Sequence, residues 1–482
     1  MLFNSLEFGI FLPIVFILYW FVAHKNLKAQ NILLVAASYF FYACWDYRFL
    51  FLLIFSTLLD YFSALQIERV SNRKRKLFWL FLSIGINLGF LGVFKYYNFF
   101  ADSFAQALSL FGIKAGFVTL HVIIPVGISF YTFHGLSYII DVYNERIPAE
   151  KDFVVYTGFV CFFPLLVAGP IERATHLLPQ IKKPRTFDYA KSVDGLRQIL
   201  WGLFKKIVIA DNCAYYVNMF FNDPSAYPGS TLLLGTIFFT FQIYCDFSGY
   251  SDIALGTARL FGIELLRNFA FPYFSRDIAE FWRRWHISLS SWFRDYLYIP
   301  LGGSRGGMWM KVRNTFIIFL VSGFWHGANW TFIAWGALNA IYFLPLMLSN
   351  LNRNNLEIVA QGKTLPTLRE FFSICLTFCL AAFAWIFFRA DSLSQAFDII
   401  AEIFSSSLFT IPYFERMGNA LITIILIGVF VLVEWKGREQ QYAIAKLGFT
   451  WTPALRYAMY YSIVFIIIWF GGREQQFIYF QF

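Results

Sequence analysis

The stretch RVSNRKRKLFWLFLSIGINLGFLGVFKYYN, residues 69–98, decides the fold class of this chain. It opens on a cluster of Lys and Arg and continues as a long apolar run that a single cation, Lys95, interrupts. An α-helix needs about 20 apolar residues to cross about 30 Å of hydrocarbon. A basic cluster beside such a run is typical of a cytoplasmic loop. The stretch therefore predicts a transmembrane helix that begins at the cytoplasmic face.

The composition of the whole chain agrees with this interpretation. Of its 482 residues, 59% are hydrophobic, 22% are aromatic and 14% are charged. A soluble domain is about 25% charged, because it must cover its core with polar groups. A bilayer removes that need, so the composition predicts a polytopic membrane protein.

Apolar runs recur along the chain and predict about eleven or twelve transmembrane helices. The segment 314–348 is too long for one span and is expected to break near Gly323 to Asn329, whereas 153–170 ends in Pro and Gly and is expected to be tilted or re-entrant. We expect one all-α membrane domain over 1–482, with N-terminal helices in 1–115, a motif-bearing core in 116–348 and C-terminal helices in 370–482. The candidate spans are 7–23, 30–45, 49–66, 77–98, 120–141, 153–170, 231–250, 314–348, 370–390, 418–435 and 455–471.

The distribution of cations predicts the orientation. No Lys or Arg precedes the first apolar run, which we expect not to be a cleaved signal, and Lys25 and Lys28 follow it. The positive-inside bias then places the N-terminus outside and residues 24–29 and 69–76 in the cytoplasm. The net charge of +10 is scattered over the loops between spans. It indicates contact with anionic lipid and argues against nucleic-acid binding.

The cysteines do not predict a site. None forms a CxxC pair or stands near a histidine with the spacing of metal ligands, so we expect neither a disulfide framework nor a metal centre. They are Cys44, Cys161, Cys213, Cys245, Cys375 and Cys379.

Three stretches place ionisable groups inside or beside apolar runs, where such groups are costly and often functional. The first is FQIYCDFSGYSDIALG, residues 241–256. Gln242 and Asp246 are four residues apart and share a helix face, and Gly249 would let another backbone approach. Two interpretations stay open: a polar contact between helices, partnered by a nearby arginine, or direct participation in a site.

The second stretch, FWRRWHISLSSWFRD at 281–295, predicts one amphipathic helix at the cytoplasmic interface. Its aromatic face is apolar, its opposite face is basic, and His286 lies at the border, where a lone histidine is more often structural. The following YIPLGGSRGG at 298–307 predicts a non-helical loop with Arg305 at its tip, suited to a phosphate-bearing ligand. The aromatic face comprises Trp282, Trp285, Leu289, Trp292, Phe293 and Tyr296.

The third stretch is VSGFWHGANWTFIAWGALNA, residues 321–340. Burial disfavours the imidazolium form, so His326 is expected to be neutral near pH 7 and able to act as a general base toward a hydroxyl. Gly323, Gly327 and Asn329 favour a broken helix that lines a cavity. The alternative is a structural histidine bonded to a backbone carbonyl.

Together these motifs resemble the membrane-bound O-acyltransferase family, and within it the bacterial alginate and peptidoglycan O-acetyltransferases. FWRRWHISLSSWFRDYLYIPLGGSR followed by VSGFWHGANWTFIAWGALNA carries the resemblance. It extends to the chain's ends, through MLFNSLEFGIFLP, FPLLVAGPIERATHLLPQI, YCDFSGYSDIALG and GGREQQFIYFQF.

The resemblance implies helices around a central tunnel, with His326 catalytic and His286 the second site residue on the donor side. It further implies transfer of an acetyl group from cytoplasmic acetyl-CoA, with no bound cofactor, to a hydroxyl of an extracytoplasmic polysaccharide. A periplasmic acetyltransferase of SGNH type, or another polysaccharide-modification protein, would be the partner in the bacterial inner membrane. We expect the substrate-binding set to be Arg283, Arg284, Arg305, Trp282, Trp285, Asp246, Gln242 and Asn329.

Three alternatives remain at this point. One is D-alanyl transfer to teichoic acid, fed by a carrier protein. Another is a transporter, because broken helices and an intramembrane Asp246 also suit a permeation path. The last is a non-catalytic scaffold for polysaccharide export.

Overall fold

The computed structural model describes residues 1–113, 123–472 and 475–478 of the chain. Over these residues every regular element is a helix and none is a strand, which confirms the all-α prediction. The start of the expected span 120–141, at 120–122, lies outside the described residues. So do residues 473–474 and 479–482 of the closing motif.

The chain divides into two compact units. Unit 1 comprises Met1–Lys191 and Ala258–Leu266, and unit 2 comprises Ser192–Thr257 and Arg267–Phe482. Each unit is described by itself.

Unit 1 is organised around the long helix α2. Asn26 caps its start by accepting hydrogen bonds from the N–H groups of Lys28 and Ala29. Non-helical backbone at Asp46 (φ −158°, ψ 110°) divides α2 between the expected spans 30–45 and 49–66. The helices of unit 1 are α1 (Leu6–Ile17), η1 (Leu18–Val22), α2 (Leu27–Arg69), α3 (Arg73–Leu91), η2 (Gly92–Tyr96), α4 (Tyr97–Ser109), α5 (Ile128–Tyr143), α6 (Phe153–Cys161), α7 (Phe163–Leu166) and α8 (Ala174–Lys182).

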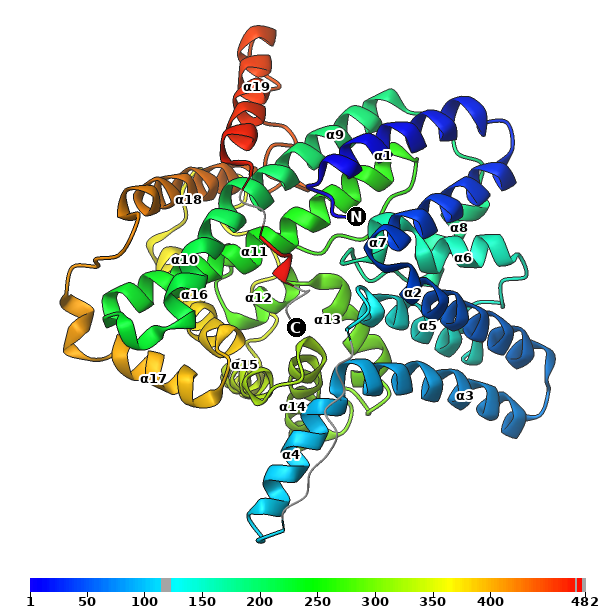
Figure 1. Ribbon diagram of the computed structural model, residues 1–482, viewed down its shortest axis with the longest axis horizontal. Helices are drawn as coiled ribbons and strands as arrows, with labels where there is room; N and C mark the ends of the chain where they lie inside the picture. The colour runs from blue at the N-terminus through cyan, green and yellow to red at the C-terminus, as the bar shows by residue number, and fades with distance from the viewer. Residues whose placement is uncertain (114–122, 473–474, 479–482) are drawn as a thin grey trace. The chain divides into compact units, whose positions relative to one another are not determined.

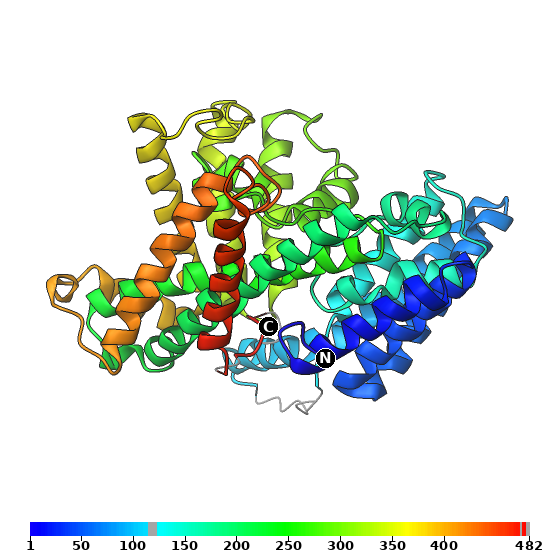
Figure 2. The same ribbon diagram turned by 90° about the horizontal axis from the view of Figure 1, so that it is seen from above.

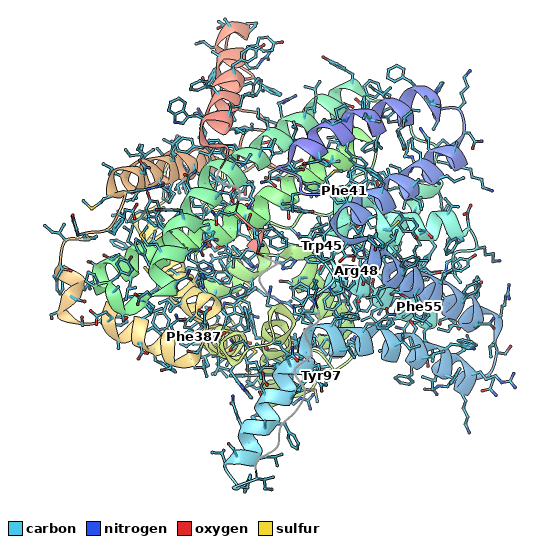
Figure 3. The ribbon with its side chains drawn as sticks, viewed as in Figure 1. Phe41, Trp45, Arg48, Phe55, Tyr97 and Phe387 are labelled. Atoms are coloured by element: carbon cyan, nitrogen blue, oxygen red, sulfur yellow. The ribbon has the colours of Figure 1, made fainter. Side chains whose placement is uncertain are left out.

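Within unit 1, α2 packs against α3 and α5 (Figure 1). Asp60 on α2 joins α2 to α3 by accepting hydrogen bonds from Ser83 Oγ (2.6 Å) and Asn87 Nδ2 (2.8 Å). The same helix buries Phe41 completely and leaves Phe55 49% exposed (Figure 3). An apolar ring left open to this extent is expected of a helix that faces lipid.

Unit 2 contains the remaining helices. Two of them, α14 and α15, lie side by side (Figure 1 and Figure 2). Of α9 (Tyr189–Leu203), the residues from Ser192 onward belong to unit 2, and of α11 (Gly229–Leu260), those up to Thr257. The other elements are η3 (Phe204–Ala210), α10 (Asp211–Asn222), η4 (Pro224–Ala226), η5 (Pro272–Phe274), α12 (Ile278–Arg284), α13 (Ile287–Phe293), η6 (Arg294–Tyr298), α14 (Gly307–His326), α15 (Trp330–Leu348), α16 (Leu368–Arg389), α17 (Leu393–Ile403), η7 (Ser406–Phe409), α18 (Met417–Gly437) and α19 (Pro453–Phe470).

Glycines set the distance between α9 and α11. A Cβ added at Gly249 would lie 2.8 Å from the carbonyl oxygen of Gly202, and one at Gly256 would collide with the carbonyl of Gly195. The close backbone approach predicted at Gly249 is therefore confirmed.

Seven helices in the described residues are long and apolar enough to cross a membrane, which makes the chain a multi-pass membrane protein. The number is below the expected eleven or twelve because several expected spans are short or broken. The segment 153–170 forms only α6 and the four-residue α7, and its tilted or re-entrant placement stays a prediction. The seven are Leu27–Arg69, Arg73–Ser109, Gly229–Leu260, Trp330–Leu348, Leu368–Arg389, Met417–Gly437 and Pro453–Phe470.

Candidate functional site

His326 is the last residue of α14, at the break predicted within 314–348. The break forms because Gly327 continues in extended backbone, where a Cβ would collide with the ring of Phe332. Asn329 then starts α15, its Oδ1 accepting from the N–H of Thr331 (3.1 Å). The imidazole of His326 is 4% exposed and is surrounded by the rings of Trp325, Trp335 and Phe388.

His286 also stands at a helix end, and here the sequence-based prediction is wrong. The single helix expected over 281–295 is broken: α12 ends at Arg284, α13 begins at Ile287 and η6 continues from Arg294. His286 lies between α12 and α13 with left-handed backbone (φ 42°, ψ 55°). A single amphipathic helix cannot describe this segment, because the chain leaves the helical conformation at His286, the residue that the sequence placed at the border of the two faces.

The aromatic side chains of this segment pack inside unit 2. Trp285, 2% exposed, lies against Trp385 with ring centroids 5.0 Å apart, and Trp292 is 7% exposed. The indole N–H of Trp282 donates to Asn339 Oδ1 (3.3 Å). These side chains therefore pack against other residues of unit 2, where the sequence had suggested a face lying on the membrane.

The two histidines meet although 40 positions separate them in the sequence. Their ring centroids are 6.3 Å apart, and Trp325 lies beside both. His286 is 1% exposed and lies edge-on to Phe247, with ring centroids 4.7 Å apart. Burial lowers the pKa of His286 to about 3, so its imidazole is neutral at physiological pH. Two buried imidazoles at one point form a site that can exchange a proton with a hydroxyl or a thiol.

The arginines next to His286 have partners within the protein. Arg284 forms an ion pair with the buried Glu280 (2.7 Å), which Arg276 also contacts (3.0 Å). Arg283 donates to the carbonyl oxygens of Asn352 (2.8 Å) and Asn355 (2.6 Å).

The glycine-rich segment after η6 is a loop, as predicted. Gly302, Gly303 and Gly307 have positive φ, and Arg305 between them is exposed. The predicted donor-binding role of Arg283, Arg284 and Arg305 stays a prediction.

Asp246 forms its ion pair with a lysine, and the charge of Arg267 acts on Asp252 of the same 241–256 cluster. Lys206 on η3 lies 2.8 Å from Asp246 and 2.7 Å from Asp211. Asp246 also accepts a hydrogen bond from the backbone N–H of Ile478 (2.7 Å), near the C-terminus. Gln242 is buried one turn earlier on α11. The lysines were visible in the sequence as LFKKIVIAD, an apolar run with two adjacent cations.

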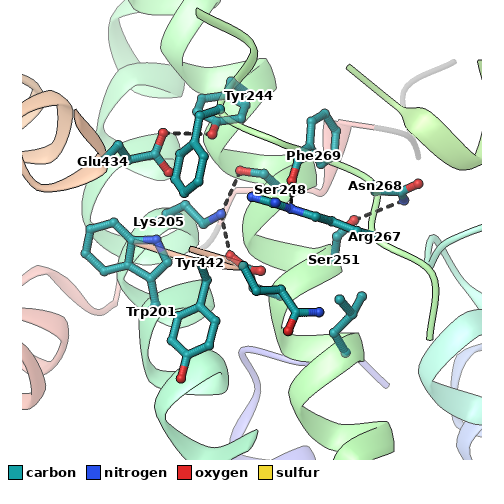
Figure 4. Close-up of a pocket in the computed structure, with 14 residues that line it drawn as sticks. Trp201, Lys205, Tyr244, Ser248, Ser251, Arg267, Asn268, Phe269, Glu434 and Tyr442 are labelled. Carbon is teal, nitrogen blue, oxygen red and sulfur yellow. Dashed lines mark hydrogen bonds and ion pairs between the residues drawn. The ribbon is translucent and has the colours of Figure 1, made fainter. Parts of the chain in front are cut away.

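A second lysine on η3 contributes to a small polar cavity (Figure 4). Lys205 lies 2.5 Å from Asp252 and donates to Ser248 Oγ (2.9 Å), while Tyr244 donates to Glu434 (2.7 Å). The cavity is lined by Trp201, Lys205, Tyr244, Ser248, Ser251, Asp252, Leu255, Arg267, Asn268, Phe269, Phe271, Glu434, Gln441 and Tyr442.

Sequence reasoning missed Arg267, Asn268 and Glu434. Arg267 and Asn268 lie in ELLRNFAFPYF, which has no helical period and contains a single cation. Phe269, which follows them, lies near the ring of His286, with centroids 6.5 Å apart. Asn268 and Phe269 therefore border the histidine site, and Glu434 belongs to the polar cavity.

Asn329 joins the His326 break to another helix. Its Nδ2 donates to the carbonyl oxygen of Asp391 (2.9 Å), just before α17 begins. Both the oxygen and the nitrogen of its side-chain amide are thus hydrogen-bonded to backbone groups. The predicted contact of Asn329 with substrate stays a prediction.

In the described residues, no group of three His, Cys, Asp or Glu side chains is placed to hold a metal ion. All six cysteine thiols are free.

Known proteins resemble the chain over most of its length. The model of the MBOAT, membrane-bound O-acyltransferase, family matches residues 142–387, which include both histidines. The probable alginate O-acetylase AlgI of Azotobacter vinelandii is 39% identical over 92% of this chain and 86% of its own length. The peptidoglycan O-acetyltransferase of Helicobacter pylori is 37% identical over 83% of this chain and 79% of its own length.

A more distant relative covers only part of the chain. The teichoic acid D-alanyltransferase of Bacillus subtilis is 31% identical over 45% of this chain and 57% of its own length. The family match over half of the chain and the long alignments with both acetylating enzymes decide the assignment. The chain belongs to the membrane-bound O-acyltransferase family and is a membrane acyltransferase.

Proposed function

We propose that the protein moves an acetyl group from cytoplasmic acetyl-CoA to a hydroxyl acceptor, as a step in the O-acetylation of an extracytoplasmic polysaccharide. The observation that carries the proposal is the pair His286 and His326, buried together with ring centroids 6.3 Å apart within the region that matches the family. The names of the relatives, an alginate O-acetylase and a peptidoglycan O-acetyltransferase, support an acetyl group and a polysaccharide acceptor.

In the proposed reaction His326 is the general base. It takes the proton of the acceptor hydroxyl as the oxygen attacks the thioester carbonyl. The C–S bond then breaks, and the leaving thiolate takes a proton from the imidazolium, so His326 returns to its neutral form. General-base catalysis of this kind contributes about 10²- to 10⁴-fold. His286 lies beside the reacting atoms on the donor side.

The remaining parts of the proposal concern placement and partners. The enzyme lies in the bacterial inner membrane with its N-terminus in the periplasm. A periplasmic acetyltransferase of SGNH type, or another polysaccharide-modification protein, passes the acetyl group to the polymer. The basic residues at the start of α3 support this orientation through the positive-inside bias. A reporter fused after Lys74 should report the cytoplasm, and a periplasmic signal would overturn the orientation.

The acetyl proposal is tested with purified protein and labelled acetyl-CoA. Wild type should consume the donor in the presence of the acceptor, and His326→Ala should lose about 10²- to 10⁴-fold in kcat. His176→Ala is the matched control, because this histidine is part-exposed and belongs to unit 1. Transfer at the wild-type rate by folded His326→Ala would remove His326 from the catalytic role.

A second candidate is D-alanyl transfer, which the partial match to teichoic acid D-alanyltransferase favours. It predicts that a D-alanyl thioester on a carrier protein is consumed and that acetyl-CoA is not. The same assay, run with both donors, decides between the two acyl groups.

A further inference from the structure

The backbone at His286 is strained. A non-glycine residue in the left-handed region costs roughly 1–2 kcal/mol, because its Cβ crowds the following carbonyl. Such a conformation persists only where neighbouring structure holds it. His286 occupies this conformation between two helices of seven residues each, which by themselves are too short to be rigid.

One neighbouring segment pairs with the chain on both sides of His286. The backbone N–H of Ala270 donates to the carbonyl oxygen of Arg284 (3.0 Å), and the N–H of Ile287 donates to the carbonyl oxygen of Asn268 (2.9 Å). The first N–H groups of a helix have no partner within the helix. Asn268 supplies that partner for the first residue of α13.

The side chain of Asn268 extends this contact in two directions. Its Oδ1 accepts from Ser288 Oγ on α13 (2.6 Å), and its Nδ2 donates to Ser251 Oγ on α11 (3.2 Å). All three side chains are buried. Because α11 is a long helix of unit 2, Asn268 joins the strained turn to a rigid element.

The orientation of the His286 imidazole decides whether it can act together with His326. The ring of His286 packs against Phe247 and Trp325, with centroid distances of 4.7 and 6.1 Å, and its centroid lies 6.3 Å from that of His326. A reacting group misplaced by about 1 Å loses on the order of 100-fold in rate.

We propose that Asn268 is the positioning residue of His286, holding its left-handed turn so that the imidazole faces His326. The inference rests on the proposed function, because it assumes that His286 takes part in acyl transfer. Asn268 acts through the turn and does not itself contact substrate.

The test is a double-mutant cycle on purified protein with labelled acetyl-CoA. Asn268→Ala should lower kcat by on the order of 100-fold with little change in KM for the donor. In a His286→Ala background the same change should cost nothing further, because the group that it positions is already gone. A residue needed only for stability would cost the same factor in both backgrounds.

Two further sets of variants keep the test decisive if Asn268→Ala folds poorly. Ser288→Ala and Ser251→Ala each remove one side-chain bond of Asn268 and should give smaller losses in kcat that also vanish with His286→Ala. Asn87→Ala is the matched control: it is a buried asparagine of unit 1 that bonds Asp60 and Ser83. Any loss in kcat that it causes should persist in the His286→Ala background.

The outcomes separate the two proposals. If His286→Ala itself transfers at the wild-type rate, the role of His286 in the proposed function fails. If His286→Ala loses activity but Asn268→Ala does not, or if the two losses multiply, only the positioning role fails.

Discussion

The rings of His286 and His326 lie close together, with centroids 6.3 Å apart, and each histidine stands at the end of a helix. A histidine in the middle of a helix points in the direction that the helix dictates. At a helix end the side chain takes its direction from the turn, so the surrounding loops can aim two imidazoles at one point. This arrangement requires strained backbone at His286 and two interrupted helices within the membrane domain.

Acid should destabilise the protein through His286. Its folded-state pKa, about 3, lies below the value of about 6.5 expected in the unfolded chain. Between these values the unfolded chain binds a proton that the folded chain does not. Stability should therefore fall as the pH drops below 6.5, by up to about 1 kcal/mol per pH unit. The thermal unfolding midpoint at pH 6.5 and pH 5 measures this loss, which should be smaller in His286→Phe.

His176 provides a control of opposite sign. Its hydrogen bond with Glu172 raises its pKa, so its contribution to stability is present below the unfolded pKa and is lost as the pH rises through the folded one. His176→Ala should therefore not reduce the acid sensitivity. An unchanged sensitivity in His286→Phe would contradict the assignment to His286.

Gly249→Ala should destabilise unit 2. The added Cβ would meet the carbonyl oxygen of Gly202 at 2.8 Å, so α9 and α11 would have to separate. Gly428→Ala is the matched control, because Gly428 lies inside α18 with no atom within 4 Å of the added Cβ. It should be neutral or slightly stabilising, since alanine favours a helix by about 1 kcal/mol over glycine. Thermal unfolding of both variants decides, and equal midpoints would contradict the close contact.

The sequence alone predicted the parts of this protein that depend on local pattern. Apolar runs predicted helices, and Gly327 together with Asn329 predicted the helix break that follows His326. The turn at His286 escaped prediction because it depends on Asn268, a distant residue whose carbonyl and side chain hold it. The partners of Asp246 escaped for the same reason: only the folded helices bring Lys206 to Asp246. Periodicity reports which face is apolar, but it does not identify the neighbour that will cover that face.

Arg284→Ala separates a structural role from a donor-binding role. The change removes one of the two arginines paired with Glu280 and leaves Arg276 in place. We expect a loss of roughly 1–3 kcal/mol, below the full cost of an unpaired buried charge. The thermal midpoint reports this loss, and the KM for acetyl-CoA reports donor binding. A lower midpoint with an unchanged KM would remove Arg284 from the donor site.

Lys205→Met should destabilise the protein strongly. The ion pair of Lys205 with Asp252 is largely buried, the two side chains being 4% and 13% exposed. Without the lysine, Asp252 keeps the hydrogen bond from Gln198 (2.8 Å) and the more distant charge of Arg267, and breaking a buried ion pair by removing one partner costs about 3–5 kcal/mol.

The double variant Lys205→Met with Asp252→Leu should recover much of this loss, because apolar side chains of similar size often replace a buried ion pair at little cost. Arg294→Ala is the control, since Arg294 is 64% exposed in its ion pair with Asp295 and such pairs contribute about 0–1 kcal/mol. Thermal unfolding midpoints of the wild type, the single variants Lys205→Met and Asp252→Leu, and the double variant measure the coupling. Additive losses in the double variant would show that Lys205 and Asp252 do not interact as a desolvated pair.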